Sequence, residues 1–237
     1  MIRGLRIGIL LLAMVVFYAC AQQAAAMMVC QVPERTVCTV LRQEKEELSF
    51  PVCLEGTTLK ILSTVCYEGA FLENGGNTPV VDALGILVEN TGEFHIRSAW
   101  VLLSGAGEPG MFLARDLPPG SRTILLETGG AAWSAEPFFS ACGGTETAET
   151  DLLSTGQLEI REVDMGTVTV TNRAQQTFFD LELSYKNYLA DADVYQGGIV
   201  YRCAVGTLHP GQSVTVTPGH YAAGYSCFVY ACSRQDL

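Results

Sequence analysis

Two stretches of the chain share one alternating pattern of apolar and polar positions. When Asn90 is set against Asn172, "ILVENTGEFHIRSAWVLL" at 86–103 and "VTVTNRAQQTFFDLELSY" at 168–185 keep their apolar positions in phase without a gap. Alternation with a period of two is that of a half-buried β-strand. The pattern therefore predicts two strands joined by a turn in each copy. Each Asn falls where the first strand ends, a position that favours Asx hydrogen bonding.

A second shared feature follows each of these stretches. Leu-x-Pro-Gly occurs in "DLPPGSRTILL" at 116–126 and again in "GTLHPGQSVTV" at 206–216, each time before a short apolar run. Pro at the second and Gly at the third turn position favour a type II turn, because Gly accepts a positive φ. The longer connection "KNYLADADVYQGG" occurs in the second copy only. With no convincing long amphipathic helix, this spacing predicts an all-β protein of two tandem antiparallel β-sandwich domains.

The repeat also predicts how the chain is divided. We expect the first β-sandwich over 30–128, with a Cys-rich N-terminal part, and the second over 157–233. The stretch between them, 129–156, is rich in Gly and acidic residues, which is typical of a linker or a long excursion. It contains "WSAEPFF", which is too apolar for a free linker, so we expect this segment to pack back on the first domain.

The first 26 residues are typical of a secretory signal peptide. Two arginines precede the uncharged run "IGILLLAMVVFYA", and the alanines at 24–26 supply a small-residue cleavage site. Two alternatives stay open. "FYAC" is similar to a degraded bacterial lipobox, which would lipidate Cys20, and residues 7–30 are long enough to form an uncleaved anchor, with membrane attachment through 7–26. All three interpretations place the rest of the chain outside the cytoplasm, either secreted or held at the outer face of the membrane.

The charge of the chain limits its partners. The net charge is −11, and the leader contributes only its two arginines, so the remainder would carry −13. Such a balance argues against nucleic acid and anionic membrane surfaces as partners. The acids are scattered, and no acidic tail is present.

Cysteine usage agrees with an oxidising compartment. Without Cys20 the count is eight, an even number that permits four disulfides in 105 connectivities. Structural disulfides are the main interpretation, and free buried thiols are the alternative. Cys227 and Cys232 lie five residues apart and should not bond each other, whereas a bridge from Cys203 to either of them fits neighbouring strands. We expect the four cysteines between 30 and 66 to pair among themselves, and Cys142 to hold the linker. The candidates are Cys30, Cys38, Cys53, Cys66, Cys142, Cys203, Cys227 and Cys232.

Candidate chemistry is sparse and concentrates in the loops expected in the second domain. His220 lies in a Gly-rich loop, and a triad with Ser226 and Asp193 can be drawn, but no G-x-S-x-G, H-E-x-x-H or phosphate-binding loop supports it. Asp191 and Asp193 are a weak start for a calcium site without the full loop pattern, so no metal and no cofactor is expected. Tyrosines in loops can form a recognition surface. The weak binding candidates are Tyr188, Asp191, Asp193, Tyr195, His220, Tyr221 and Tyr225.

The rhythm of "VTVTNRAQQTFFDLELSY" resembles the immunoglobulin-like modules of bacterial secreted and surface proteins, of the CARDB kind. The resemblance covers about 85–127 and 166–217, implies the fold alone, and carries over no functional residue. We therefore expect a non-enzymatic extracytoplasmic binding or adhesion module whose partner is an extracellular protein or glycan. The alternatives are a structural component of a membrane-held surface assembly and a hydrolase with its site in the loops of the second domain.

Overall fold

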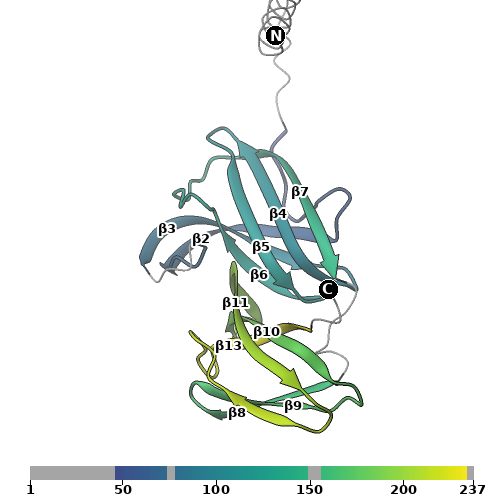
Figure 1. Ribbon diagram of the computed structural model, residues 1–237. Coiled ribbons are helices and arrows are strands. Elements are labelled where there is room, and N and C mark those ends of the chain that lie inside the picture. Colours follow the sequence, from purple (N-terminus) through teal and green to yellow (C-terminus); the bar gives the residue numbers. More distant parts are fainter. Residues whose placement is uncertain (1–45, 74–77, 149–155, 234–237) are drawn as a thin grey trace, which may run out of the picture. The chain divides into compact units, whose positions relative to one another are not determined.

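The described residues of the chain form strands and no helix. The computed structural model describes residues 46–73, 78–148 and 156–233 (Figure 1), which belong to one compact unit, Lys45–Leu237. The predicted all-β class is confirmed. The predicted leader at 1–26, with Cys20, and the cysteines at 30 and 38 lie outside the described residues. Within the described part, no helix is available that is long and apolar enough to cross a membrane.

The strands of the first half form two layers. One layer has the order β1-β2-β3-β6 and the other has the order β5-β4-β7, with all neighbours antiparallel. Inward side chains of both layers, among them Ile61, Val88, Val101 and Phe112, are fully buried in one core. The strands are β1 (Val52–Cys53), β2 (Leu59–Ala70), β3 (Pro79–Asn90), β4 (His95–Gly105), β5 (Gly110–Leu117), β6 (Arg122–Leu126) and β7 (Phe138–Ala148).

The second half repeats this arrangement strand for strand. One layer has the order β12-β9-β8 and the other has the order β11-β10-β13. Thus β8 to β13 pair with one another as β2 to β7 do, so the repeat extends beyond the stretches in which the sequence shows it. Val168, Val170, Leu183 and Tyr185 lie in the core between these layers. The strands are β8 (Leu158–Asp164), β9 (Thr167–Asn172), β10 (Phe178–Leu189), β11 (Val194–Leu208), β12 (Ser213–Val216) and β13 (Ser226–Cys232).

One fully buried asparagine closes each copy of the repeat in the same way. Asn90 is the last residue of β3, and its Nδ2 donates to the carbonyl oxygens of Phe94 (2.9 Å) and Leu117 (3.1 Å). Its side chain thus joins the end of one strand, the start of the next and the Leu of Leu-x-Pro-Gly. The same bonds in the second copy run from Asn172 Nδ2 to the carbonyl oxygens of Gln176 (2.7 Å) and Leu208 (2.9 Å).

The two Pro-Gly turns have the geometry that the sequence predicts. Gly120 and Gly211 have φ values of 69° and 71°, a region that favours glycine. Their N–H groups donate to the carbonyl oxygens of Asn90 (2.8 Å) and Asn172 (2.9 Å), so each turn packs against its asparagine. The turns are closed by bonds from Ser121 N to Pro118 O (3.2 Å) and from Gln212 N to His209 O (2.9 Å).

The stretch between the two predicted domains differs from a simple linker. Residues 138–148 form β7, which pairs along almost its whole length with β4 and completes the β5-β4-β7 layer. Phe138 packs against the core of the first half, as its apolar "WSAEPFF" segment indicates. This part of 129–156 therefore belongs to the first half rather than to a free connection.

The two halves share one sheet. Strand β6 of the first half pairs in parallel with β11 of the second, with Thr123 opposite Tyr195 and Ile124 opposite Gln196. The result is a seven-stranded sheet of order β1-β2-β3-β6-β11-β10-β13 that runs through both halves (Figure 1).

Candidate functional site

The connection between β10 and β11 forms one wall of an open pocket. The sequence predicts a longer, turn-rich connection here over 186–198, but most of that stretch is strand: only 190–193 connect β10 to β11, as many residues as the 106–109 that connect β4 to β5. A pocket of about 440 Å³ lies between it and the loop before β13. Tyr188, Asp191 and Tyr225, which the sequence singles out, lie in its lining together with Leu189, Ala190, Ala192 and Gly224.

Hydrogen bonds fix the two loops around the pocket. Tyr188 N donates to Tyr225 O at 2.8 Å, which ties the end of β10 to the loop before β13. The Tyr188 hydroxyl donates to Asp193 Oδ1 at 2.5 Å, and this bond raises the pKa of Tyr188. Asp193 has a φ of 53°, which turns the chain back into β11. Tyr225, by contrast, is 70% exposed and offers its ring to solvent.

Tyr195 supports the pocket from behind. Its ring lies 5.1 Å from that of Tyr188, centroid to centroid, and its hydroxyl donates to Cys227 Sγ at 3.8 Å. Burial is the main cause that raises the pKa of Tyr195. Among the predicted residues, Tyr188, Asp191 and Tyr225 therefore line the pocket, while Asp193 and Tyr195 position Tyr188.

His220 and Tyr221 do not line this pocket. The His220 ring stacks on Tyr201 with centroids 5.3 Å apart. Tyr221 is buried against Phe228, and its hydroxyl donates to Glu162 Oε1. These two residues fix the loop before β13 to the body of the second half.

His220, Ser226 and Asp193 do not form a catalytic triad in the structure. Asp193 is engaged by Tyr188, His220 stacks on Tyr201, and Ser226 Oγ accepts a bond from Ala222 N at 3.1 Å. Over 46–73, 78–148 and 156–233, no group of three His, Cys, Asp or Glu side chains is placed to hold a metal ion.

The predicted disulfides among the described cysteines are not formed. The thiols of Cys53, Cys66 and Cys142 are exposed, and those of Cys203, Cys227 and Cys232 are partly buried; all six are free. The other two candidates, Cys30 and Cys38, lie outside the described residues.

Strand order explains why Cys203 reaches neither expected partner. Cys203 lies opposite Leu183, and Cys232 lies opposite Glu182, so β10 separates β11 from β13. Two strand spacings are about 9.5 Å, beyond the Cα separation of about 7 Å that a disulfide tolerates. The expectation that these strands are neighbours was wrong.

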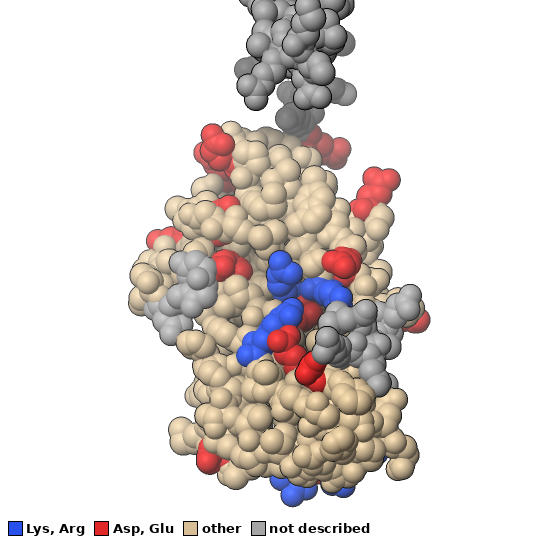
Figure 2. Space-filling model, in the orientation of Figure 1, with Lys and Arg blue, Asp and Glu red and all other residues tan. Residues whose placement is uncertain are grey.

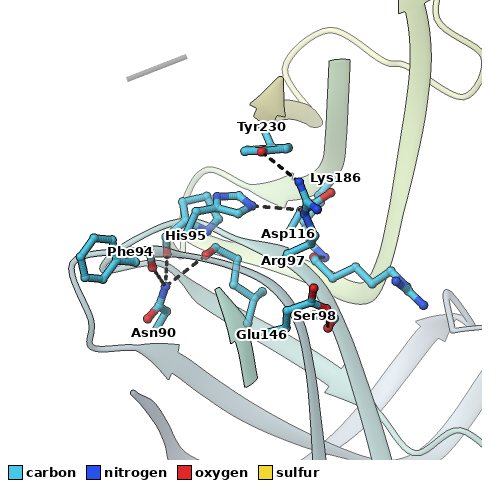
Figure 3. A network of polar contacts seen from close by, with 12 residues as sticks. Asn90, Phe94, His95, Arg97, Ser98, Asp116, Glu146, Lys186 and Tyr230 are labelled. Atoms are coloured by element: carbon cyan, nitrogen blue, oxygen red, sulfur yellow. Dashed lines mark hydrogen bonds and ion pairs between the residues drawn. The ribbon is translucent and has the colours of Figure 1, made fainter. Parts of the chain in front are cut away.

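A polar network that the sequence did not indicate lies where the halves meet (Figure 3). Lys186, on β10, is completely buried, and its Nζ donates to the carbonyl oxygens of Arg115 and Ile199, both at 2.9 Å. Burial lowers the pKa of Lys186 to about 8, against the opposing effect of the Glu73 and Asp116 carboxylates. No signal in the sequence indicates this role, because Lys186 begins the stretch "KNYLADADVYQGG" that is predicted to be a connection.

Glu73 bridges the same junction. Its carboxylate accepts hydrogen bonds from Leu126 N (2.7 Å) and Gly198 N (2.9 Å), one from each half. Burial raises the pKa of Glu73, and the two backbone donors and Lys186 oppose that shift. Leu126 and Gly198 follow the paired residues of β6 and β11. The Glu73 carboxylate therefore links the two strands by hydrogen bonds beyond the point where their backbone pairing ends.

A buried histidine and an aromatic ring complete the network. His95 Nε2 lies 3.2 Å from Asp116 Oδ1, and its ring stacks on Tyr230 with centroids 4.6 Å apart (Figure 3). Arg97 Nη2 donates to the Tyr230 hydroxyl at 3.4 Å. Because the side chains of His95 and Asp116 are only 1% and 2% exposed, the pair packs the junction and offers no site to a substrate.

The comparisons with known proteins give no relative. Neither a scan with protein-family models nor a search of curated protein sequences found a match.

Proposed function

We propose that the protein is a non-enzymatic extracytoplasmic binding module and that it binds a cationic side chain of a partner protein in the pocket of Tyr188, Asp191 and Tyr225. We further propose that each half is an immunoglobulin-like sandwich. The pairing of the first strand with the second and of the second with the fifth, opposite a layer made from the third, fourth and sixth, supports this assignment.

One observation carries the proposed binding function. Tyr188 at the end of β10, Asp191 in the connection that follows it and Tyr225 in the loop before β13 bring two aromatic rings and one carboxylate to a single open pocket. Because the Tyr188 hydroxyl is engaged by Asp193, the Asp191 carboxylate is the lining's anionic group for a guest. A guanidinium or ammonium group can stack on an aromatic ring and pair with a carboxylate at the same time.

The net charge of the chain favours the same partner. At −11, the protein attracts basic surfaces over long distances and repels acidic ones. The exposed ring of Tyr225 is of the kind that carries binding energy at protein interfaces.

The test is an NMR titration with two probes that differ only in charge. N-acetyl-arginine amide should shift the amide resonances of 188–192 and 224–225 with a Kd of about 1 mM, which is typical of a single side chain. Isosteric N-acetyl-citrulline amide should not. Added salt should weaken the arginine complex, because the pocket is open to solvent.

Matched variants locate the binding. Asp191→Asn and Tyr225→Ala should each remove the shifts, whereas Tyr225→Phe should keep them. Glu93→Gln removes one exposed negative charge elsewhere and should leave the titration unchanged. Equal binding of citrulline, or undiminished binding by Asp191→Asn, would refute the proposal.

The two alternative functions gain less support. A hydrolase in the same loops would need His220, Ser226 and Asp193 in contact, and their hydrogen bonds and ring contacts hold them apart. A membrane-held structural component depends on residues 1–26, which lie outside the described residues.

A further inference from the structure

The outer face of the β5-β4-β7 layer carries a contiguous apolar patch. In the strand register, Trp100 lies between Leu113 and Gly144, and Leu102 lies between Met111 and Cys142. Trp100 is 43% exposed, Leu113 48% and Met111 37%. We call this patch the Trp100 face, defined by Trp100, Leu102, Met111, Leu113 and Cys142.

Gly144 holds the indole of Trp100 flat against the sheet. A Cβ atom at Gly144 would lie 2.6 Å from Trp100 Nε1 and 3.1 Å from its Cε2. The indole therefore occupies the space that a side chain on the neighbouring strand would fill. Its edge is fixed by the backbone of β7 while the ring stays exposed, which gives a rigid stacking surface.

Polar groups border the Trp100 face on one side. The next register row contains Arg115, Ser98 and Glu146, and Ser98 Oγ donates to Glu146 Oε2 at 3.0 Å. Donors and acceptors thus lie two residues along the strands from the indole, about 7 Å away. Figure 2 shows a broad area over β4, β5 and β7 with few charged side chains, bordered below by basic and acidic ones.

A pocket continues the face beyond β5. It has a volume of about 260 Å³, and Leu113, Arg115, Glu73 and Gly198 are among its lining residues. Leu113 and Arg115 therefore belong both to the surface around Trp100 and to this pocket. The apolar Trp100 face, the polar groups beside it and this pocket therefore form one continuous surface.

The size of the face decides between a second copy and a smaller ligand. Three strands and two rows of side chains cover on the order of 200 Å², whereas a stable dimer buries about 800 Å² on each partner. Two copies that each carry −11 also repel one another. The same charge disfavours an acidic polymer, and the five residues of the face include no carboxylate with which a cation could pair. The fitting occupant is therefore small, uncharged, and apolar on one side with hydroxyl groups at its edge.

We propose that the Trp100 face binds a neutral oligosaccharide, with one sugar ring stacked on Trp100. The C–H groups on one face of a pyranose ring match the indole. The hydroxyls at its edge match Ser98, Arg115 and Glu146, and a neighbouring residue of the glycan reaches Leu113 and the pocket. This site is separate from the tyrosine pocket and does not depend on it.

The experiment uses two neutral probes, cellohexaose and chitohexaose, with the Trp100 indole N–H resonance as the readout. We expect a saturable shift of this resonance with at least one probe, and no shift of the Trp133 indole N–H. Trp133, 39% exposed in the same half, is the matched control. By isothermal titration calorimetry, which needs no indole signal, Trp133→Phe should bind as the wild type does, and Trp100→Ala should bind at least about tenfold more weakly.

A second variant tests the flat geometry without removing the tryptophan. Gly144→Ala should push the indole off the sheet and weaken binding about tenfold, whereas Gly166→Ala, where a Cβ meets no neighbour within 4 Å, should have no effect. The proposal fails if neither probe shifts the Trp100 resonance, or if both Trp100→Ala and Gly144→Ala bind normally. It also fails if the wild type sediments as a dimer and Trp100→Ala as a monomer, because a second copy then covers the face.

Discussion

Asn90 and Asn172 each satisfy several backbone groups with one side-chain amide. While Nδ2 donates to two carbonyl groups, Oδ1 accepts from the N–H two residues ahead, Gly92 (3.1 Å) for Asn90 and Ala174 (2.8 Å) for Asn172. Aspartate offers the acceptor but no donor, and its charge would be buried. The side-chain amide is therefore the one small group that serves both needs, which accounts for its use in both copies.

We predict that Asn172→Ala lowers the free energy of unfolding by about 3 kcal/mol, because it removes three side-chain hydrogen bonds, one of them to the buried carbonyl group of Leu208. Asn172→Asp should be at least as harmful at neutral pH. Urea unfolding measures both, and Gln175→Ala, in the exposed turn that follows, is the control. A loss below about 1 kcal/mol for Asn172→Ala would show that water replaces the amide.

Lys186 gives the stability of the protein a pH dependence of definite sign. Its pKa is lowered to about 8 in the fold, so between pH 8 and its ordinary value of 10.5 the unfolded chain binds more protons than the folded one. Stability from this group therefore rises with pH through that window. Tyrosines and thiols whose pKa values are raised by burial, such as Tyr185 and Cys203, act in the opposite direction.

A comparison with Lys186→Met isolates the lysine. From pH 8 to 9.5, the stability of the wild type relative to this variant should rise by about 1.5 kcal/mol, which is less than the full 1.36 kcal/mol per pH unit because the folded amine is already half deprotonated at pH 8. Urea unfolding at four or five pH values measures the difference. A constant difference would mean that the amine stays protonated in the fold throughout this range.

At the level of elements, the sequence predicts a strand where side chains on both faces make the period of two visible. β4 and β10 alternate clearly and carry the repeat. β7 does not, because Gly143 and Gly144 stand where Leu54 and Trp100 approach the backbone. Close packing there requires residues without side chains, and it removes the pattern from which a strand is predicted.

The residues of the candidate site also fall into those that the sequence could predict and those that it could not. Asp191 and Tyr225 lie in loops, as the sequence predicts, whereas Tyr188 and Tyr195, which were also expected in loops, lie at the facing ends of β10 and β11. The roles of Lys186 and Glu73 were not predictable, since each has a backbone partner in the other half, Arg115 for Lys186 and Gly198 for Glu73. The disulfide expectation failed for the related reason that pairing depends on the order of strands in space, which local sequence does not encode.

At the scale of the whole molecule, the junction depends on one close backbone approach. A Cβ atom at Gly198 would lie 1.7 Å from the carbonyl oxygen of Leu113, across the contact of β11 with β5. Gly198 N also donates to Glu73, and its neighbour Ile199 accepts from Lys186. Any side chain at this position must move the halves apart and break both polar links.

The chain offers a separate optical probe for each half. Both tryptophans, Trp100 and Trp133, lie in the first half, so their fluorescence reports its unfolding. The described tyrosines lie in the second half with the exception of Tyr67, so the tyrosine near-UV signal reports mainly the second. Because the shared sheet couples the halves, the two signals should change at one urea concentration in the wild type.

We predict that Gly198→Ala separates these transitions. A steric clash with backbone cannot relax by a rotamer change, so the variant should lose the coupling while each half keeps its own core. The half with the weaker core should unfold first. Gly166→Ala, in the open turn between β8 and β9, should leave the transitions together. Coincident transitions in Gly198→Ala would show that the cores couple the halves without the close approach of β11 to β5. Separate transitions already in the wild type would show that the shared sheet is too short to couple them.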